Sequence, residues 1–249
     1  MWLRKTGHCV QTVNASSAKD KVGNTPSVGE VWKMLEQRGW LAERAPDVRD
    51  RLRSIARVRT YRPGEPLYTM GEAPQGVYGI AQGALDISIP RQDGQEIVVH
   101  RAQAGFWIGD LALFSGQQRL VTVIASTEVV AACLPKGRLA QLLERYPGLI
   151  ADFYVLSHRN VATLLQLLAN LSIPRAETRI ALRLLIYDQR QTNTQDWIPL
   201  SQEKLAEVTA LSVPTVQRAL RGLVETGLVE LGYGRLRIRD RERLLRYCG

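Results

Sequence analysis

The chain has 249 residues, of which 45% are hydrophobic and 23% charged, and its formal net charge is +9. This composition is typical of a globular protein with room for two domains, and the basic balance suits a polyanionic partner. The three cysteines lie far apart, so we expect no disulfide framework. No apolar run reaches membrane-spanning length, so we expect no membrane span. Because the start also lacks the apolar core of a signal peptide, we expect a cytoplasmic location.

The first 57 residues divide into two parts. Residues 1–27 are polar and mixed, which predicts a flexible lead. Over residues 28–57 apolar side chains recur at helical spacing, interrupted by a glycine and a proline, so we expect two or three short helices. Trp32 and Trp40 should pack these helices against the next domain.

From residue 58 to about residue 135 the pattern changes to short apolar runs separated by Gly and Pro. Asp93-Gly94 is a strong hairpin signal between two of these runs. Many short strands at regular spacing predict an antiparallel barrel or a double-sheet jelly roll. The fold class is therefore α+β, since helices resume after the strands.

One long helix is predicted over residues 149–171, which contain no Gly or Pro. Residues alternating by four and three form a heptad seam along it, the spacing by which two helices pair. The alternative is a single amphipathic helix lying on its own domain. We favour a homodimer, because a second strip with Phe153, Leu156 and Leu167 remains free to cover the barrel. The seam comprises Ile150, Tyr154, Ser157, Val161, Leu164, Leu168 and Leu171.

The stretch LSQEKLAEVTALSVPTVQRALRGL, residues 200–223, predicts two short helices joined by a tight turn. Ser201 and Ser212 stand where a hydroxyl caps a helix, and Pro214 falls in a first helical turn, where its missing N–H costs little. We interpret the stretch as a helix-turn-helix whose second helix enters the DNA major groove. The alternative is an ordinary helical hairpin with a solvated polar face.

The residues after this stretch predict two strands around Gly232–Gly234, a wing beside the second helix, with Arg235, Arg237 and Arg239 available to phosphates. We expect Arg218 to pair with guanine and Val213 or Pro214 to touch a thymine methyl. The full predicted DNA-binding set is Ser201, Ser212, Val213, Pro214, Thr215, Gln217, Arg218, Arg221 and Arg235.

Taken in order, these segments resemble the cyclic-AMP receptor protein and fumarate–nitrate reductase regulator (CRP/FNR) family of bacterial transcription factors, over roughly residues 30–240. YRPGEPLYTMGEAPQGVYGIAQGALDIS looks like the family's first barrel motif, and FWIGDLALFSGQQRLVTVIAST looks like its phosphate-binding cassette. The resemblance implies a cyclic-nucleotide-binding-like barrel, a dimerisation helix and a C-terminal winged helix-turn-helix. The expected domains are 28–148 for the sensor, 149–173 for the dimer helix and hinge, and 174–249 for the DNA-binding domain.

In nucleotide-binding members of the family, a Gly-Glu pair and an Arg-Ser pair hold the cyclic nucleotide. The matching positions here are Gly109, Asp110, Arg119 and Leu120. Leucine cannot donate to a phosphate, so the resemblance implies that cyclic AMP is not bound in the usual mode. Arg119 has two interpretations, ligand binding or a structural pair with Asp110. The predicted effector pocket comprises Gly109, Asp110, Leu111, Arg119, Leu120, Leu164 and Leu165.

The nature of the effector stays open at this point. A cavity lined by Arg119 and Asp110 would favour an anionic ligand, and a filled barrel would favour none. Only Cys9 lies near the N-terminus, so no iron–sulfur cluster is expected, and His100 and His158 are expected to be surface or packing histidines rather than haem ligands. We therefore predict no metal site.

The sequence as a whole predicts a homodimeric transcription regulator that binds palindromic double-stranded DNA and works with RNA polymerase. No certain cofactor and no catalytic residue are predicted, and a small-molecule effector is possible. The alternatives are an effector-independent regulator of the same family, an architectural DNA-binding protein, or a nucleotide-binding regulatory subunit of an enzyme.

Overall fold

A computed structural model describes residues 26–91, 93–188 and 197–248. Most of the predicted flexible lead, Cys9 and nearly all of the polar loop predicted at residues 190–197 lie outside the described residues. The described chain begins with α1 (Val28–Leu35), the 3₁₀ helix η1 (Leu41–Glu43) and α2 (Pro46–Ile55). Ser27 and Glu30 form a capping box at α1, each side chain accepting from the other's backbone N–H.

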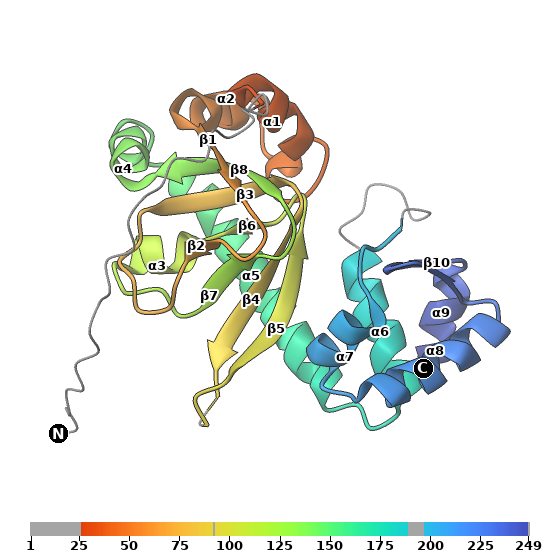
Figure 1. The fold of residues 1–249 in the computed structure, drawn as a ribbon. Coiled ribbons are helices and arrows are strands. Elements are labelled where there is room, and N and C mark those ends of the chain that lie inside the picture. Colours follow the sequence, from red (N-terminus) through yellow and green to blue (C-terminus); the bar gives the residue numbers. More distant parts are fainter. Residues whose placement is uncertain (1–25, 92, 189–196, 249) are drawn as a thin grey trace, which may run out of the picture.

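Eight antiparallel strands form two facing four-stranded sheets (Figure 1). The first sheet has the order β1 (Arg57–Tyr61), β8 (Val129–Pro135), β3 (Gly76–Gln82) and β6 (Trp107–Ile108). The second has the order β2 (Pro66–Tyr68), β7 (Thr122–Ala125), β4 (Ala84–Pro90) and β5 (Glu96–Gln103). The predicted turn at Asp93-Gly94 joins β4 to β5, where Pro90 pairs with Glu96. The barrel prediction is confirmed.

The N-terminal helices close one face of this barrel through a cluster of tryptophans. Trp40 and Trp107 pack edge to face with ring centroids 5.3 Å apart, and Trp32 lies 6.2 Å from Trp107. Gly79 on β3 makes room for them, because a Cβ there would lie 2.4 Å from the Trp107 ring. Trp32 and Trp40 therefore pack the N-terminal helices against the barrel, as predicted.

Three helices surround the barrel: α3 (Asp110–Ser115), α4 (Lys136–Arg145) and α5 (Leu149–Leu171). The helix α5 runs behind the barrel and leads towards the C-terminal domain (Figure 1). Phe153, Leu156 and Leu167 on α5 are buried, so one of its faces covers the barrel as expected. Its length matches the prediction because no Gly or Pro interrupts residues 149–171.

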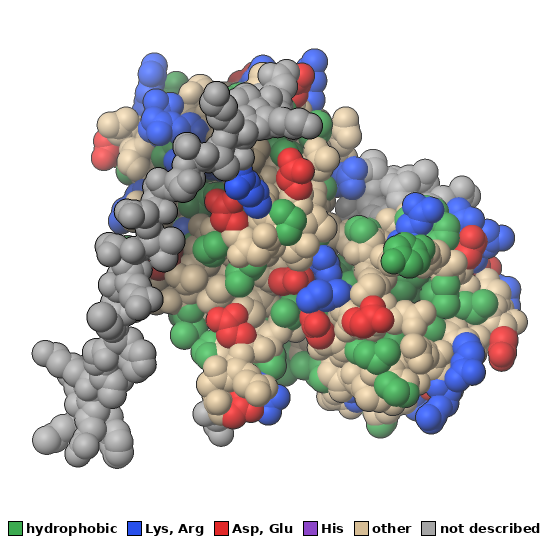
Figure 2. All heavy atoms as spheres, in the orientation of Figure 1, with side chains coloured by type: hydrophobic (Ala, Val, Ile, Leu, Met, Phe, Trp, Pro, Cys, Tyr) green, Lys and Arg blue, Asp and Glu red, His purple; other side chains and the backbone are tan. Residues whose placement is uncertain are grey.

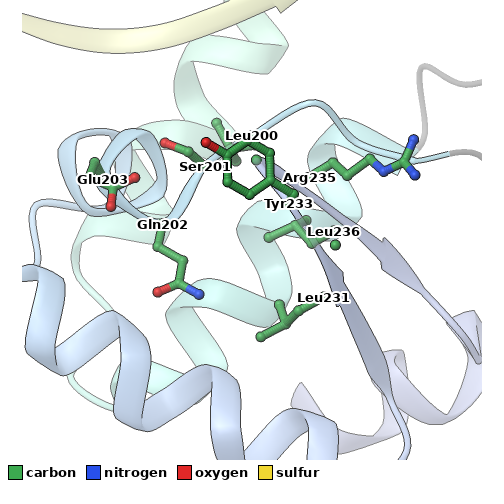
Figure 3. A pocket seen from close by; sticks show the side chains of 10 residues that line it. Leu200, Ser201, Gln202, Glu203, Leu231, Tyr233, Arg235 and Leu236 are labelled. Carbon is green, nitrogen blue, oxygen red and sulfur yellow. The ribbon is translucent and has the colours of Figure 1, made fainter.

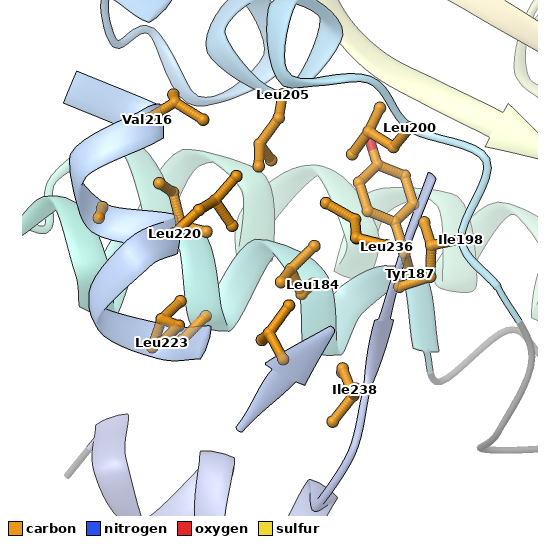
Figure 4. Packing of buried hydrophobic residues seen from close by; sticks show 14 of the residues in the cluster. Leu184, Tyr187, Ile198, Leu200, Leu205, Val216, Leu220, Leu223, Leu236 and Ile238 are labelled. Atoms are coloured by element: carbon orange, nitrogen blue, oxygen red, sulfur yellow. The ribbon is translucent and has the colours of Figure 1, made fainter. Parts of the chain in front are cut away.

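The C-terminal domain contains α6 (Ala176–Asp188), α7 (Gln202–Thr209), α8 (Val213–Glu225), β9 (Val229–Gly232), β10 (Arg235–Ile238) and α9 (Arg241–Cys248). Apolar side chains of these elements point into one core, shown in Figure 4. Leu184, Leu205, Leu220 and Leu223 are fully buried there. Ile198 forms an antiparallel β-bridge with Leu236 and so extends the two-stranded wing by one pairing. No helix of the described residues is long and apolar enough to cross a membrane.

Candidate nucleic-acid interface and sensor pocket

The first turn of α8, the second helix of the predicted motif, determines where this helix begins. The hydroxyl of Ser212 accepts the backbone N–H of Thr215, and Pro214 occupies the first turn. The helix is strongly amphipathic, with Val216 and Leu220 buried on one face. Its position in the domain is therefore fixed by that face.

The opposite face of α8 is available to a partner. Gln217, Arg218 and Arg221 are exposed, as is Pro214, while Thr215 is half-buried. Arginine and glutamine side chains on a helix of this width fit the major groove and donate to base edges and phosphates. Val213 is also half-buried and packs against the domain core. Basic side chains also gather along the outer edge of this domain (Figure 2).

The turn between α7 and α8 depends on residues that sequence reasoning missed. Ala210 has a φ of +52°, a left-handed conformation that is uncommon for a residue with a Cβ. Arg179 on α6 donates to the carbonyl oxygen of Thr209 at 3.1 Å and to that of Ile173 at 2.6 and 2.8 Å. One partly buried guanidinium thus joins the end of α7 to the segment that links α5 and α6.

The wing places its arginines differently. Arg235 and Arg237 lie over the Trp197 ring, 4.5 and 4.8 Å from its centroid. Arg237 and Arg239 both pair with Glu230, at 2.8 and 2.7 Å, and these contacts hold the pKa of Glu230 below its ordinary value. Two of the three wing arginines are therefore already engaged with a carboxylate.

An open groove of about 580 Å³ separates the wing from the start of α7 (Figure 3). Ser201 caps α7 beside it by accepting the backbone N–H of Lys204. Tyr233 at the tip of the wing is fully exposed beside the groove, and Arg235 lines its far side. The predicted DNA-binding residues Ser201 and Arg235 thus border one groove.

The barrel contains a second cavity, of about 400 Å³, between α3, α5 and the sheet of β4 and β5. Leu165, which was also predicted to line it, is exposed elsewhere on α5 and does not. Neighbouring helix positions point about 100° apart, and the side of α5 that lines the cavity ends at Leu164, so Leu165 points away from it. Six of the seven predicted pocket residues do line it: Gly109, Asp110, Leu111, Arg119, Leu120 and Leu164.

Arg119 is buried in the wall of this cavity and holds the cassette together. Its guanidinium donates to the carbonyl oxygens of Gly109 and Gly76, both at 2.8 Å, and lies over the ring of Tyr68. Gly109 has a φ of +103°, and a Cβ there would lie 2.8 Å from Arg119 Nη1, so glycine is required at this position. The expected pairing of Arg119 with Asp110 is not among the contacts of the described residues.

Asp110 instead joins α3 to the long helix. Its carboxylate accepts hydrogen bonds from the Ser157 hydroxyl and from Asn160 Nδ2, the latter at 3.0 Å. Burial raises the pKa of Asp110, and the two hydrogen bonds act against this rise. Ser157, predicted as a seam residue, is thus turned towards the cavity.

The other predicted seam residues form an exposed apolar strip on α5. Tyr154 is 77% exposed, Leu168 64% and Leu164 57%. Ile150, Val161 and Leu171 are also exposed. An uncovered strip of this size on one helix is unusual in a monomer and marks an interaction surface.

The boundary between the barrel and the C-terminal domain holds further contacts that sequence reasoning missed. His100 on β5 is buried and stacks on Tyr187 of α6, with ring centroids 5.8 Å apart. Lys204 Nζ lies 3.6 Å from a carboxylate oxygen of Asp86 on β4. Acidic and basic side chains meet along this boundary (Figure 2). His100 is thus a packing histidine, while His158 is exposed.

Comparison with known proteins places both domains. Residues 58–146 match the cyclic nucleotide-binding domain family, and residues 178–247 match the Crp-like helix-turn-helix domain family. The chain belongs to the CRP/FNR family of transcriptional regulators. Its barrel and its helix-turn-helix are therefore the family's sensor and DNA-binding domains.

Relatives and solved structures agree with this assignment. The chain is 28% identical to the cyclic AMP receptor protein of Thermus thermophilus, over 79% of this chain and 90% of the relative. It is 25% identical to the cAMP-activated global transcriptional regulator CRP of Escherichia coli, over 71% and 86%. The structure of FixK2 from Bradyrhizobium japonicum shares the fold with a TM-score of 0.68 at 22% identity, over 77% of this chain and 96% of that one.

Proposed function

We propose that this regulator binds DNA as a homodimer paired through α5. The observation that carries the proposal is the exposed apolar strip from Ile150 to Leu171, which repeats at heptad spacing and lies beside the face that covers the barrel. A second copy of the same strip would cover it symmetrically. The two DNA-binding domains would then face one palindrome, with half-sites about one helical turn apart.

Sequence reading belongs to α8 in this proposal. Arg218 is exposed in its central turn, where a guanidinium can pair with guanine O6 and N7, a contact that typically contributes about 1–3 kcal/mol of discrimination. Arg221 would contact the phosphates, and Gln217 would contact a neighbouring base. Val213 is half-buried, so of the two apolar residues proposed for a thymine methyl, Pro214 is the more accessible.

Selection of bound sequences from random DNA tests this proposal. The wild-type chain should return a two-fold palindrome, and Arg218→Ala should return one that has lost a base pair preference in each half-site. Arg221→Ala is the matched control, which should weaken binding to all sequences alike. Identical motifs from the wild type and Arg218→Ala would contradict the assignment of Arg218.

The sensor barrel, we propose further, responds to an effector other than cyclic AMP bound in the usual mode. Leu120 stands where a hydroxyl donor would hold the phosphate, and both guanidinium Nη atoms of Arg119 already donate to backbone carbonyls. A cavity of about 400 Å³ favours an effector over an effector-independent regulator. Mass spectrometry of ligands that copurify with the chain separates the two, since an effector-independent regulator carries none.

RNA polymerase is the protein partner that we propose, because relatives are named as transcriptional regulators. This action would take place in the cytoplasm with the DNA. An architectural DNA-binding protein would bind random DNA as tightly as the selected palindrome, so random DNA would compete equally well at every salt concentration. A role as an enzyme subunit has no catalytic residue to support it among the sites described.

A further inference from the structure

We propose that the barrel cavity binds a neutral, largely apolar small molecule. This inference rests on the proposed function of the barrel as an effector domain and names the chemical class of that effector. It follows from three properties of the cavity: its apolar lining, the internal pairing of its polar groups and its balance of charge.

Apolar side chains dominate the cavity from floor to mouth. Ile87 and Phe106 belong to the barrel interior, and Leu167 closes the side formed by α5. The mouth is formed by Leu111, Leu120 and Leu164, which are all more than half exposed. A ligand that removes these surfaces from water gains about 25 cal/mol for each Å² of apolar area that becomes buried.

Most of the polar side chains in the lining are already paired. Asp110 accepts from Ser157 and Asn160, and Arg119 donates to two carbonyl oxygens. His100 packs between Phe106 and Tyr187, and Thr163 also has a partner. A ligand with several charged or polar groups would have to break these pairs or leave its own groups unpaired, and both are costly in a buried site.

The charges of the cavity also point to a neutral ligand. Arg119 and Asp110 both line it, so one positive and one negative group balance there. An anionic ligand, which the sequence suggested for a cavity lined by this pair, would meet Asp110 as well as Arg119.

Two fluorescent probes with the same ring system test this proposal. N-phenyl-1-naphthylamine is neutral, and 8-anilino-1-naphthalenesulfonate adds a sulfonate to the same skeleton. The full-length chain should bind the neutral probe about tenfold or more tightly than the anionic one, because the sulfonate must be desolvated beside Asp110. Cyclic AMP should fail to displace the neutral probe.

Two variants place the probe in the cavity. Val121→Trp fills the interior and should reduce affinity for the neutral probe about tenfold or more. Leu120→Ser is safe for folding because Leu120 is 64% exposed, and it should weaken the neutral probe severalfold while improving cyclic AMP binding. Met34→Ser, at an exposed position of α1 outside the cavity, is the matched control and should change neither affinity.

Tighter binding of the sulfonate or of cyclic AMP than of the neutral probe would overturn the proposal. So would neutral-probe affinity that is unchanged in both Val121→Trp and Leu120→Ser, since the probe would then bind elsewhere, such as the exposed strip on α5. Operator binding is measured on the same samples. Intact operator binding with a failed probe test rejects the ligand class alone, whereas lost operator selection rejects the proposed function.

Discussion

The DNA-binding domain and the sensor cavity use their polar side chains in opposite ways. On α8 the polar side chains Gln217, Arg218 and Arg221 point to solvent, above a core with no exposed face. In the cavity Arg119 and Asp110 are turned onto neighbouring protein groups, and apolar surface faces the space. The donors on α8 are available to a polyanion, whereas few donors in the cavity are available to a cyclic phosphate. The proposed function thus combines the family's DNA-binding output with a different effector.

Disruption of the strip on α5 should have the largest effect. Leu168→Lys would place two ammonium groups in the proposed symmetric interface, where an unpaired buried charge costs several kcal/mol. We expect dimerisation to weaken about 100-fold or more, and operator affinity to fall with it. Sedimentation velocity and fluorescence anisotropy measure the two effects.

The control for this variant is Gln166→Lys, which adds the same charge to the same helix. Residues two positions apart on a helix point about 200° apart, so this lysine faces away from the strip. Equal dimerisation by Leu168→Lys and Gln166→Lys would show that the strip on α5 is not the interface.

Two leucine-to-alanine variants compare how tightly the DNA-binding domain and the barrel cavity are packed. Leu220 is fully buried in the core of the DNA-binding domain, whereas Leu167 is buried but lines the cavity. Leu220→Ala should lower the free energy of unfolding by about 2–5 kcal/mol. Leu167→Ala should cost less, because part of its surface already faces space rather than packed atoms. Urea unfolding measures both, and equal costs would mean that the cavity is collapsed in solution.

The pH dependence of stability tests the environment of Asp110. Burial raises the pKa of Asp110 in the folded chain, so folding makes this carboxyl easier to protonate than it is in the unfolded chain. The stabilisation from this group is complete below its unfolded pKa of about 3.9 and is lost as the pH rises through its folded pKa. Asp110→Asn stays neutral, so the wild type should lose stability relative to this variant as the pH rises. Thermal unfolding at a series of pH values should show that trend, and a constant difference would argue against it.

The smallest effect is expected at the wing. Glu230→Gln removes the carboxylate that pairs with Arg237 and Arg239 and frees both for phosphates. We expect affinity for DNA of any sequence to rise about two- to fivefold at low salt, with a steeper salt dependence. Glu225→Gln removes the same charge from the end of α8 and should raise affinity less. If both variants behave alike, the arginines are not released by the change.

Helix boundaries were predictable where local sequence determines them. Pro147 and the uninterrupted run from 149 to 171 define the start and length of α5, and Ser212 with Pro214 defines the start of α8. The heptad spacing also predicted which side chains of α5 are exposed. Ser157 is the exception, because its hydroxyl donates to Asp110 instead of lying along the strip.

Contacts between distant segments could not be predicted in this way. The partners of Arg119 are backbone carbonyls, which no side-chain pattern reveals, and the stacking of His100 on Tyr187 joins residues of two domains. The wrong placement of Leu165 in the pocket has a similar origin. Only the rotation of α5 against the barrel decides that the cavity side of this helix includes Leu164 and not Leu165.

A single titration tests the contrast between the two regions most directly. The palindrome obtained by selection is labelled, and its affinity for the wild-type chain is measured by fluorescence anisotropy as cyclic AMP is added. The proposed function predicts sequence-specific binding by two protomers for each palindrome, with an affinity that cyclic AMP does not change. An affinity for the palindrome that rises tenfold or more with cyclic AMP would contradict it, because the cavity would then bind the nucleotide and transmit its presence to α8.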